Sequence, residues 1–163
     1  MTDANQELLD HVGVTRLQQA YADLATRRAW DELDQLFLPD ARIVIAVGGG
    51  DTLEFTGPDP FGAFVGPSVD QFDFFEFVIL NTRIETAFGG DPDAAAARMW
   101  MAELRQWADS GRWSVAYGLY QDAYRRLDGR WWFAQRDYQS LARTSLDGPR
   151  ALEHFPFPQQ YKF

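Results

Sequence analysis

The chain has 163 residues, 46% of them hydrophobic and 15% aromatic, and its formal net charge is −9 at pH 7. This length and hydrophobic fraction exclude disorder for most of the chain and predict one domain with one substantial core. The negative charge argues against nucleic acid as a partner, because phosphate binding needs clustered Lys and Arg side chains.

The absence of cysteine excludes disulfides, thiolate nucleophiles and cysteine-ligated metals. His11 and His154 are the only histidines and have no ligand-like spacing, so we expect neither a metal nor a cofactor. No basic and then apolar segment resembles a secretory signal, and no run of about 18 apolar residues could cross a membrane. We therefore expect a cytoplasmic protein that makes no membrane contact.

The first 37 residues predict two helices. Thr2 or Asp3 can cap a helix that runs to about residue 28, with Gly13 as a possible bend. Tyr21 falls on its apolar stripe and should point inward. The other stripe residues are Leu17, Ala20, Leu24 and Ala25. A short second helix should span residues 30–37 and end at Pro39-Asp40.

The middle of the chain predicts strands around a short lid. Residues 41–47 form a strand, and Gly48-Gly49-Gly50 is a flexible turn into a returning strand at residues 52–56. This turn lacks the Gly-Lys-Ser/Thr ending of a phosphate-binding loop. Residues 57–66 should form a short lid with Phe61 and Phe64 facing inward, and residues 74–86 another strand.

Residues 98–143 predict a three-stranded antiparallel meander. The sequences ADSGR and RLDGR separate three runs rich in aromatic and β-branched residues. With three-residue loops, Asp122 would lie opposite Ala134 and Arg98, and Tyr120 opposite Arg136 and Trp100. One face would then carry Arg98, Trp100, Ala102, Tyr120, Asp122, Tyr124, Ala134, Arg136 and Tyr138. A two-residue type I′ turn at Asp128-Gly129 would instead place Gln135, and not Arg136, on the face of Asp122.

Two helices, a strand, a short helix and a curved meander predict an α+β cone, in which a curved antiparallel sheet packs on the N-terminal helices and leaves a pocket at the wide end. At this point the chain resembles the nuclear transport factor 2-like superfamily, and specifically its SnoaL-like branch. Three segments carry the resemblance: YADLATRRAWDELDQLFLPDARI (21–43), FVILNTRIE (77–85) and GLYQDAYRRLDGRWWFAQR (118–136). The resemblance implies a single domain over residues 1–143. The proline-rich tail that follows, over 144–163, should pack on the surface or on a partner subunit. Members include ketosteroid isomerases, polyketide cyclases, dehydratases and epoxide hydrolases, and others only bind a ligand, so the fold alone does not assign a function.

The resemblance also implies site residues. Tyr21 matches the tyrosine with which ketosteroid isomerase stabilises an oxyanion, and Asp122 matches that enzyme's protonated aspartic acid. Arg136 matches the arginine that closes the family's last strand. The isomerase's base falls at about Ile45. The dehydratases' usual Asp and His fall at Thr26 and Phe77, so both familiar bases are missing.

Each candidate residue could instead have a purely structural role, in packing or in ion pairing. Tyr21 is either a pocket donor or a core tyrosine bonded to a backbone carbonyl. Asp122 is either an acid–base group or the partner of Arg98 and Arg136 in an ion-pair network. Aromatic residues of the shared face, together with Phe64 and Phe77, are either a ligand-stacking wall or plain core. Glu76, Glu85 and Glu103 are strand residues that more often face solvent than act as bases.

Two functional hypotheses follow. The first is a cofactor-independent lyase, isomerase or cyclase acting on a hydrophobic, oxygenated, ring-bearing molecule, with Tyr21, Asp122 and Arg136 as catalytic residues. Its substrate-binding residues would be Phe64, Phe77, Arg98, Trp100, Tyr120 and Tyr138. The second is a binding module of the same fold without turnover. In both we expect a homodimer through the sheet, because the odd-numbered face is also apolar. That face would carry Met99, Met101, Trp107, Trp113, Tyr117, Leu119, Trp131 and Phe133.

Overall fold

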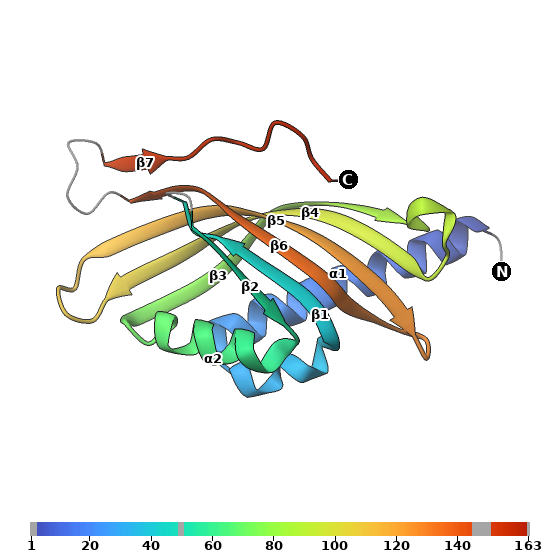
Figure 1. Cartoon of the computed structure of the whole chain (residues 1–163), viewed down its shortest axis with the longest axis horizontal. Helices are drawn as coiled ribbons and strands as arrows, with labels where there is room; N and C mark the ends of the chain where they lie inside the picture. Colours follow the sequence, from blue (N-terminus) through green and yellow to red (C-terminus); the bar gives the residue numbers. More distant parts are fainter. Residues whose placement is uncertain (1–2, 49–50, 145–150, 163) are drawn as a thin grey trace.

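A computed structural model describes residues 3–48, 51–144 and 151–162 of the chain. A long helix, α1 (Asp3–Arg27), lies under a curved sheet of seven strands. The 3₁₀ helix η1 (Trp30–Gln35) and helix α2 (Pro58–Val69) lie on the same side of the sheet (Figure 1). The architecture is therefore α+β, as predicted, with the helices gathered on one face of an open sheet.

The sheet is mixed and not wholly antiparallel. Its strand order is β2-β1-β6-β5-β4-β3, with the short β7 paired to β6, and the contact between β1 and β6 is parallel. The strands are β1 (Phe37–Ala46), β2 (Thr52–Thr56), β3 (Phe72–Thr86), β4 (Ala94–Trp107), β5 (Trp113–Leu127), β6 (Arg130–Thr144) and β7 (Leu152–His154). A three-residue 3₁₀ turn, η2 (Phe88–Gly90), follows β3. Within β1, Pro39 is accommodated because pairing with β6 is interrupted between Phe37 and Arg42.

Several predicted boundaries are corrected by the structure. Helix α1 is continuous through Gly13, where an added Cβ would lie 2.6 Å from the ring of Trp131, so this glycine permits close packing and marks no bend. The predicted second helix is only the 3₁₀ turn η1, and β1 begins before Ala41. The lid is a full helix that continues to Val69. Thr2, Gly49, Gly50 and residues 145–150 lie outside the described residues.

The preferred hairpin register between β5 and β6 was wrong. Asp128 and Gly129 both have positive φ, at 51° and 75°, and form a two-residue turn with Leu127 opposite Arg130. A β-bulge at Ala134 then adds one residue to β6, so that Asp122 lies opposite Arg136. The alternative turn was therefore right, but its predicted loss of Arg136 from the face of Asp122 was wrong, because the bulge compensates for the turn.

The register between β4 and β5 was also wrong. Trp107 and Arg112 close a four-residue loop, and the pairing that follows places Ala97 opposite Asp122 and Leu119 opposite Trp100. A shift by one residue exchanges the two faces of a strand. Met99, Met101, Glu103, Arg105 and Trp107 therefore lie on the face that carries Tyr120 and Asp122. Arg98 and Trp100 lie on the opposite, outer face and cannot line a pocket between sheet and helices.

The outer face is partly covered by the end of the chain. Trp100 contacts the rings of Phe157 and Tyr161, with centroids 6.0 and 6.2 Å away, and the Arg98 guanidinium lies over Tyr161. Figure 1 shows this segment above the sheet, on the side away from the helices. Residues from this segment therefore lie against the outer face of the sheet. The odd-numbered apolar face does not exist as predicted, because five of its eight residues point to the helix side.

Candidate active site

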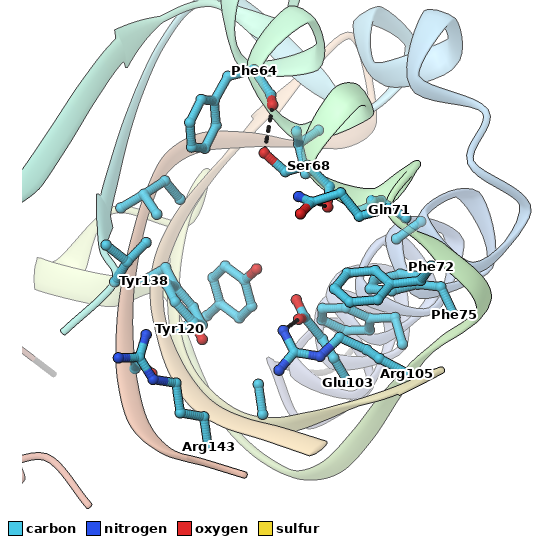
Figure 2. A pocket seen from close by; sticks show the side chains of 18 of the residues that line it. Phe64, Ser68, Gln71, Phe72, Phe75, Glu103, Arg105, Tyr120, Tyr138 and Arg143 are labelled. Carbon is cyan, nitrogen blue, oxygen red and sulfur yellow. Dashed lines mark hydrogen bonds and ion pairs between the residues drawn. The ribbon is translucent and has the colours of Figure 1, made fainter. Parts of the chain in front are cut away.

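A cavity of about 740 Å³ lies between the inner face of the sheet and the helices. Strand β4 sends Glu103 and Arg105 into it, and Tyr120 and Tyr138 stand on its wall from β5 and β6 (Figure 2). Aromatic side chains from α2 and β3 cover the remaining sides, including Phe61, Phe64, Phe72, Phe75 and Phe77. A largely apolar cavity with a few convergent polar groups is typical of a small-molecule site.

Tyr21 reaches the cavity from α1 because the buried stripe of that helix faces the sheet. The stripe consists of Val14, Leu17, Gln18, Tyr21, Leu24 and Ala25. The ring of Tyr21 meets Phe77 and Tyr120 edge-on, with centroids 5.4 and 6.3 Å apart. Burial raises the pKa of Tyr21 and of Tyr120, so both hydroxyls keep their protons at neutral pH and can donate hydrogen bonds.

Arg136 lies directly behind the two tyrosines. Its guanidinium carbon is 4.0 Å from the ring centroid of Tyr21, 4.2 Å from Tyr120 and 4.3 Å from Phe133. Its side chain has no exposed surface, and its Nη1 has no hydrogen-bond partner among the described residues. A buried cation against the aromatic faces favours the negative charge that develops on a tyrosine-bound oxygen.

Asp122 holds Arg136 from the other side. Arg136 donates from Nε and Nη2 to the two carboxylate oxygens, at 3.0 and 2.8 Å. Tyr124 donates to the same carboxylate at 3.1 Å, and Gln18 donates to Tyr124. Burial raises the pKa of Asp122, and the Arg136 charge opposes that shift. Asp122 is therefore desolvated and paired with Arg136, while Arg98, the other partner expected for it, lies on the outer face of the sheet.

Glu103 and Arg105 are the charged pair that sequence reasoning missed. They lie on the cavity face of β4, with Arg105 Nη1 3.4 Å from the Glu103 carboxylate (Figure 2). Burial raises the pKa of Glu103, and Arg105 acts against this shift. The predicted register placed Glu103 on the odd-numbered face, away from the predicted pocket, whereas the observed register places it on the cavity face. The signal available in the sequence was the alternation Glu103, Arg105, Trp107, which places three polar-tipped side chains on one face.

Several buried donors around the cavity have no acceptor among the described residues. They are the indole N–H groups of Trp30 and Trp107 and the Nε of Arg105, and all three residues line the cavity. A buried unpaired donor costs free energy. These three nitrogen atoms have almost no accessible surface, so they lie within the wall and do not open onto the cavity.

The positions at which relatives carry a catalytic base are occupied here by Ile45, Thr26 and Phe77, none of which is an acid or a histidine. The backbone N–H of Phe77 donates to Thr26 Oγ1 at 3.1 Å, so the two positions are adjacent in space. Ile45 and Phe77 line the cavity with apolar side chains. None of the three can accept a proton from a ligand.

The predicted site residues divide into three groups. Tyr21, Phe64, Phe77, Tyr120 and Tyr138 line the cavity. Asp122 and Arg136 lie behind its wall. Arg98 and Trp100 lie outside, because of the four-residue loop between β4 and β5. In residues 3–48, 51–144 and 151–162, no three His, Asp or Glu side chains come together as a metal-ligand set, and no helix has the length and apolarity to span a membrane.

Comparison with protein-family sequence profiles matched the SnoaL-like domain over residues 6–137, which is most of the chain. The chain belongs to the SnoaL-like domain family. Searching curated protein sequences gave no match.

Solved structures agree with this SnoaL-like assignment at the level of the fold. A candidate scytalone dehydratase from Novosphingobium aromaticivorans DSM 12444 is 19% identical, with a TM-score of 0.76 over 91% of this chain and 95% of that one. The hexachlorocyclohexane dehydrochlorinase LinA-type3 from Novosphingobium barchaimii LL02 is 20% identical, with a TM-score of 0.72 over 96% of this chain and 100% of that one. At these identities the likeness establishes the fold of the SnoaL-like chain. It does not assign a reaction, which has to be argued from the residues of the site.

Proposed function

We propose that this SnoaL-like protein is a cofactor-independent lyase, isomerase or cyclase acting on a hydrophobic, oxygenated, ring-bearing small molecule. The observation that carries the proposal is the pair of tyrosines, Tyr21 and Tyr120, at the wall of an aromatic cavity with the buried cation of Arg136 behind them. The names of the structural relatives, a dehydratase and a dehydrochlorinase, support a reaction in which a proton and a leaving group depart from neighbouring atoms.

In this proposal the tyrosine hydroxyls donate hydrogen bonds to a carbonyl or leaving-group oxygen. Negative charge that develops on this oxygen is stabilised by the donors and, through the rings, by Arg136. Asp122 does not line the cavity, so its expected role as an acid or base becomes a positioning role: it fixes the guanidinium against the two rings. The aromatic side chains Phe64, Phe77 and Tyr138 hold the ring of the substrate.

A second candidate function is ligand binding without turnover. It is favoured by Thr26 and Phe77, because the family's familiar base positions are filled by a structural hydrogen bond and an apolar ring. The same cavity and the same tyrosine hydroxyls would then hold an oxygenated ligand, and no proton would move.

We also propose a homodimer through the uncovered part of the outer sheet face. Four large apolar side chains there are exposed: Phe74, Leu80, Trp113 and Tyr117. Phe74 and Trp113 are in ring contact, 5.3 Å between centroids, and form a continuous apolar surface suited to association.

The test of the proposed function is turnover on cyclic β-hydroxy ketones, followed by mass spectrometry for loss of water. The double variant Tyr21→Phe/Tyr120→Phe keeps both rings and removes both hydroxyls. Turnover by the native protein that falls by at least about a hundredfold in the double variant supports the enzyme, because each lost oxyanion donor costs about that factor or more. Tight binding of the same compounds without any turnover would favour the binding module.

A further inference from the structure

The proposed reaction needs a group that takes a proton, and both familiar family bases are absent. The described residues place two carboxyl groups at the cavity, Glu103 and Glu153. Glu153 is about half exposed and forms an ion pair with Arg143 at 3.0 Å, so it lies at the solvent side. Glu103 is the interior one, and its side chain is 23% accessible.

We propose that Glu103 is the general base of this site. The inference rests on the proposed function and adds the residue that moves the proton. Its carboxylate projects from β4 into the cavity, as Figure 2 shows, and its nearest charged partner is Arg105 at 3.4 Å, a long and incomplete ion pair that leaves acceptor capacity free.

The placement of Glu103 fits the charges around it. Burial raises the pKa of Tyr21 on α1, of Tyr120 on β5 and of Tyr138 on β6, and the charge of Glu103 adds to each increase. Arg105 on its own strand is the nearest cation, Arg143 of β6 also lines the cavity, and β3 contributes the apolar Phe75 and Phe77. A substrate between the tyrosines and β4 would thus have hydrogen-bond donors on one side and a proton acceptor on the other.

Burial strengthens a carboxylate as a base. Desolvation raises the pKa of Glu103 above its ordinary value of 4.5, which moves its proton affinity toward neutral pH. The charge of Arg105 keeps a useful fraction ionised. Activity should therefore rise with pH along a single ionisation whose midpoint lies above 4.5.

The probe we choose is 5-nitrobenzisoxazole, an aromatic compound with one acidic C–H bond. A base removes this proton, the C–H electrons complete a carbon–nitrogen triple bond, and the nitrogen–oxygen bond breaks with its electrons left on oxygen. The product is a coloured cyano-nitrophenolate, whose oxygen the tyrosine hydroxyls can hold. The step needs no oxidant, metal or second reactant, so its rate depends directly on the base that removes the proton.

The experiment measures this elimination, and binding of the product phenolate, in four proteins. Glu103→Gln should lower the rate by about a hundredfold or more with product affinity within a few-fold of native. Glu103→Asp keeps a carboxylate but moves it back from the cavity because the side chain is one methylene shorter. Its rate of elimination should lie between those of the native protein and Glu103→Gln. The matched control Glu76→Gln, on the exposed side of β3, should leave rate and affinity unchanged.

The outcomes separate the two proposals. Product binding with no acceleration by the native protein, or acceleration undiminished in folded Glu103→Gln, overturns the role of Glu103 and leaves the cavity as a ligand site. Absence of both binding and acceleration overturns the proposed function and the base together. Circular dichroism of each variant establishes that it is folded.

Discussion

At the scale of single residues, the pair Asp122–Arg136 is the best-defined polar feature of the molecule. Both side chains have no exposed surface and share two hydrogen bonds. Asp122→Asn keeps the shape but leaves a guanidinium buried without its counter-charge, which should cost about 3–5 kcal/mol of unfolding free energy. Urea denaturation measures this loss.

The control for this variant is Asp91→Asn, which breaks an exposed ion pair with Arg125. Exposed pairs contribute little because water screens them. A loss in Asp122→Asn no larger than in Asp91→Asn would show that Asp122 does not anchor Arg136.

Glu103 gives a pH prediction whose sign follows from its raised pKa. Between the ordinary value of 4.5 and the folded value, the native state holds a proton that the unfolded state has lost, so stability falls as pH rises through this window. Glu103→Gln removes that loss. The variant should gain stability over the native protein at pH values above this window, and the gain should vanish below about pH 4 because both states are then protonated.

Urea denaturation at several pH values tests this difference, since other titrating groups contribute equally to both proteins. A gain that grows as the pH falls would contradict the assignment of Glu103 as a desolvated carboxyl group.

At the scale of elements, the sequence predicted the β1–β2 hairpin and the meander, but neither the parallel pairing of β1 with β6 nor the registers of the meander. Helix α1, the β1–β2 hairpin and the meander all follow from hydrophobic pattern and turn residues. The errors lie at the Asp128-Gly129 turn, at the bulge of Ala134 and at the four-residue loop before Arg112. Ala134 carries no side-chain signal for a bulge, and loops of three and four residues have similar compositions. A shift of one residue in register exchanges the two faces of a strand. Arg98 and Trp100 were therefore predicted on the cavity face, and Glu103 on the opposite face.

Gly118 shows how an element's backbone shapes the cavity. It lies opposite Ser140, and a Cβ at this position would overlap the ring of Tyr138, which rests on the bare backbone. Gly118→Ala should displace Tyr138 into the cavity and destabilise the protein by about 1–3 kcal/mol. The same substitution in a Tyr138→Ala background should cost much less, and a double-mutant cycle by urea denaturation measures the difference. Equal costs in both backgrounds would contradict the overlap.

At the scale of the whole molecule, the C-terminal segment covers one part of the outer sheet face and leaves another part exposed. Residues 151–162 cover Trp100, and the backbone N–H of Lys162 donates to Gln121 Oε1 at 2.7 Å, while Trp113 and Phe74 stay exposed. The sequence predicted a surface-packed tail from its proline content but gave no sign of β7 or of the face that the tail covers. No periodic pattern marks these contacts, because they join single aromatic residues across the fold.

The exposed part of this face predicts a dimer at micromolar concentration. Trp113→Asp places a charge in the proposed interface and should convert the dimer to a monomer in sedimentation velocity. Leu8→Asp is the control, since Leu8 is also exposed, at 63% against 56% for Trp113, but lies on α1. A native protein that sediments only as a monomer would contradict the dimer.

The central claim is that the tyrosine pair holds an oxygen of an aromatic ligand. Calorimetric titration with 2-acetylnaphthalene and with 2-ethylnaphthalene tests it most directly, because the two compounds have similar shapes and only the first carries an acceptor oxygen. We expect the native protein to bind the ketone about tenfold more tightly, the factor that one well-placed hydrogen bond provides. The preference should disappear in Tyr21→Phe/Tyr120→Phe. Equal affinities in the native protein, or a preference for the ketone that survives the loss of both hydroxyls, would contradict the account.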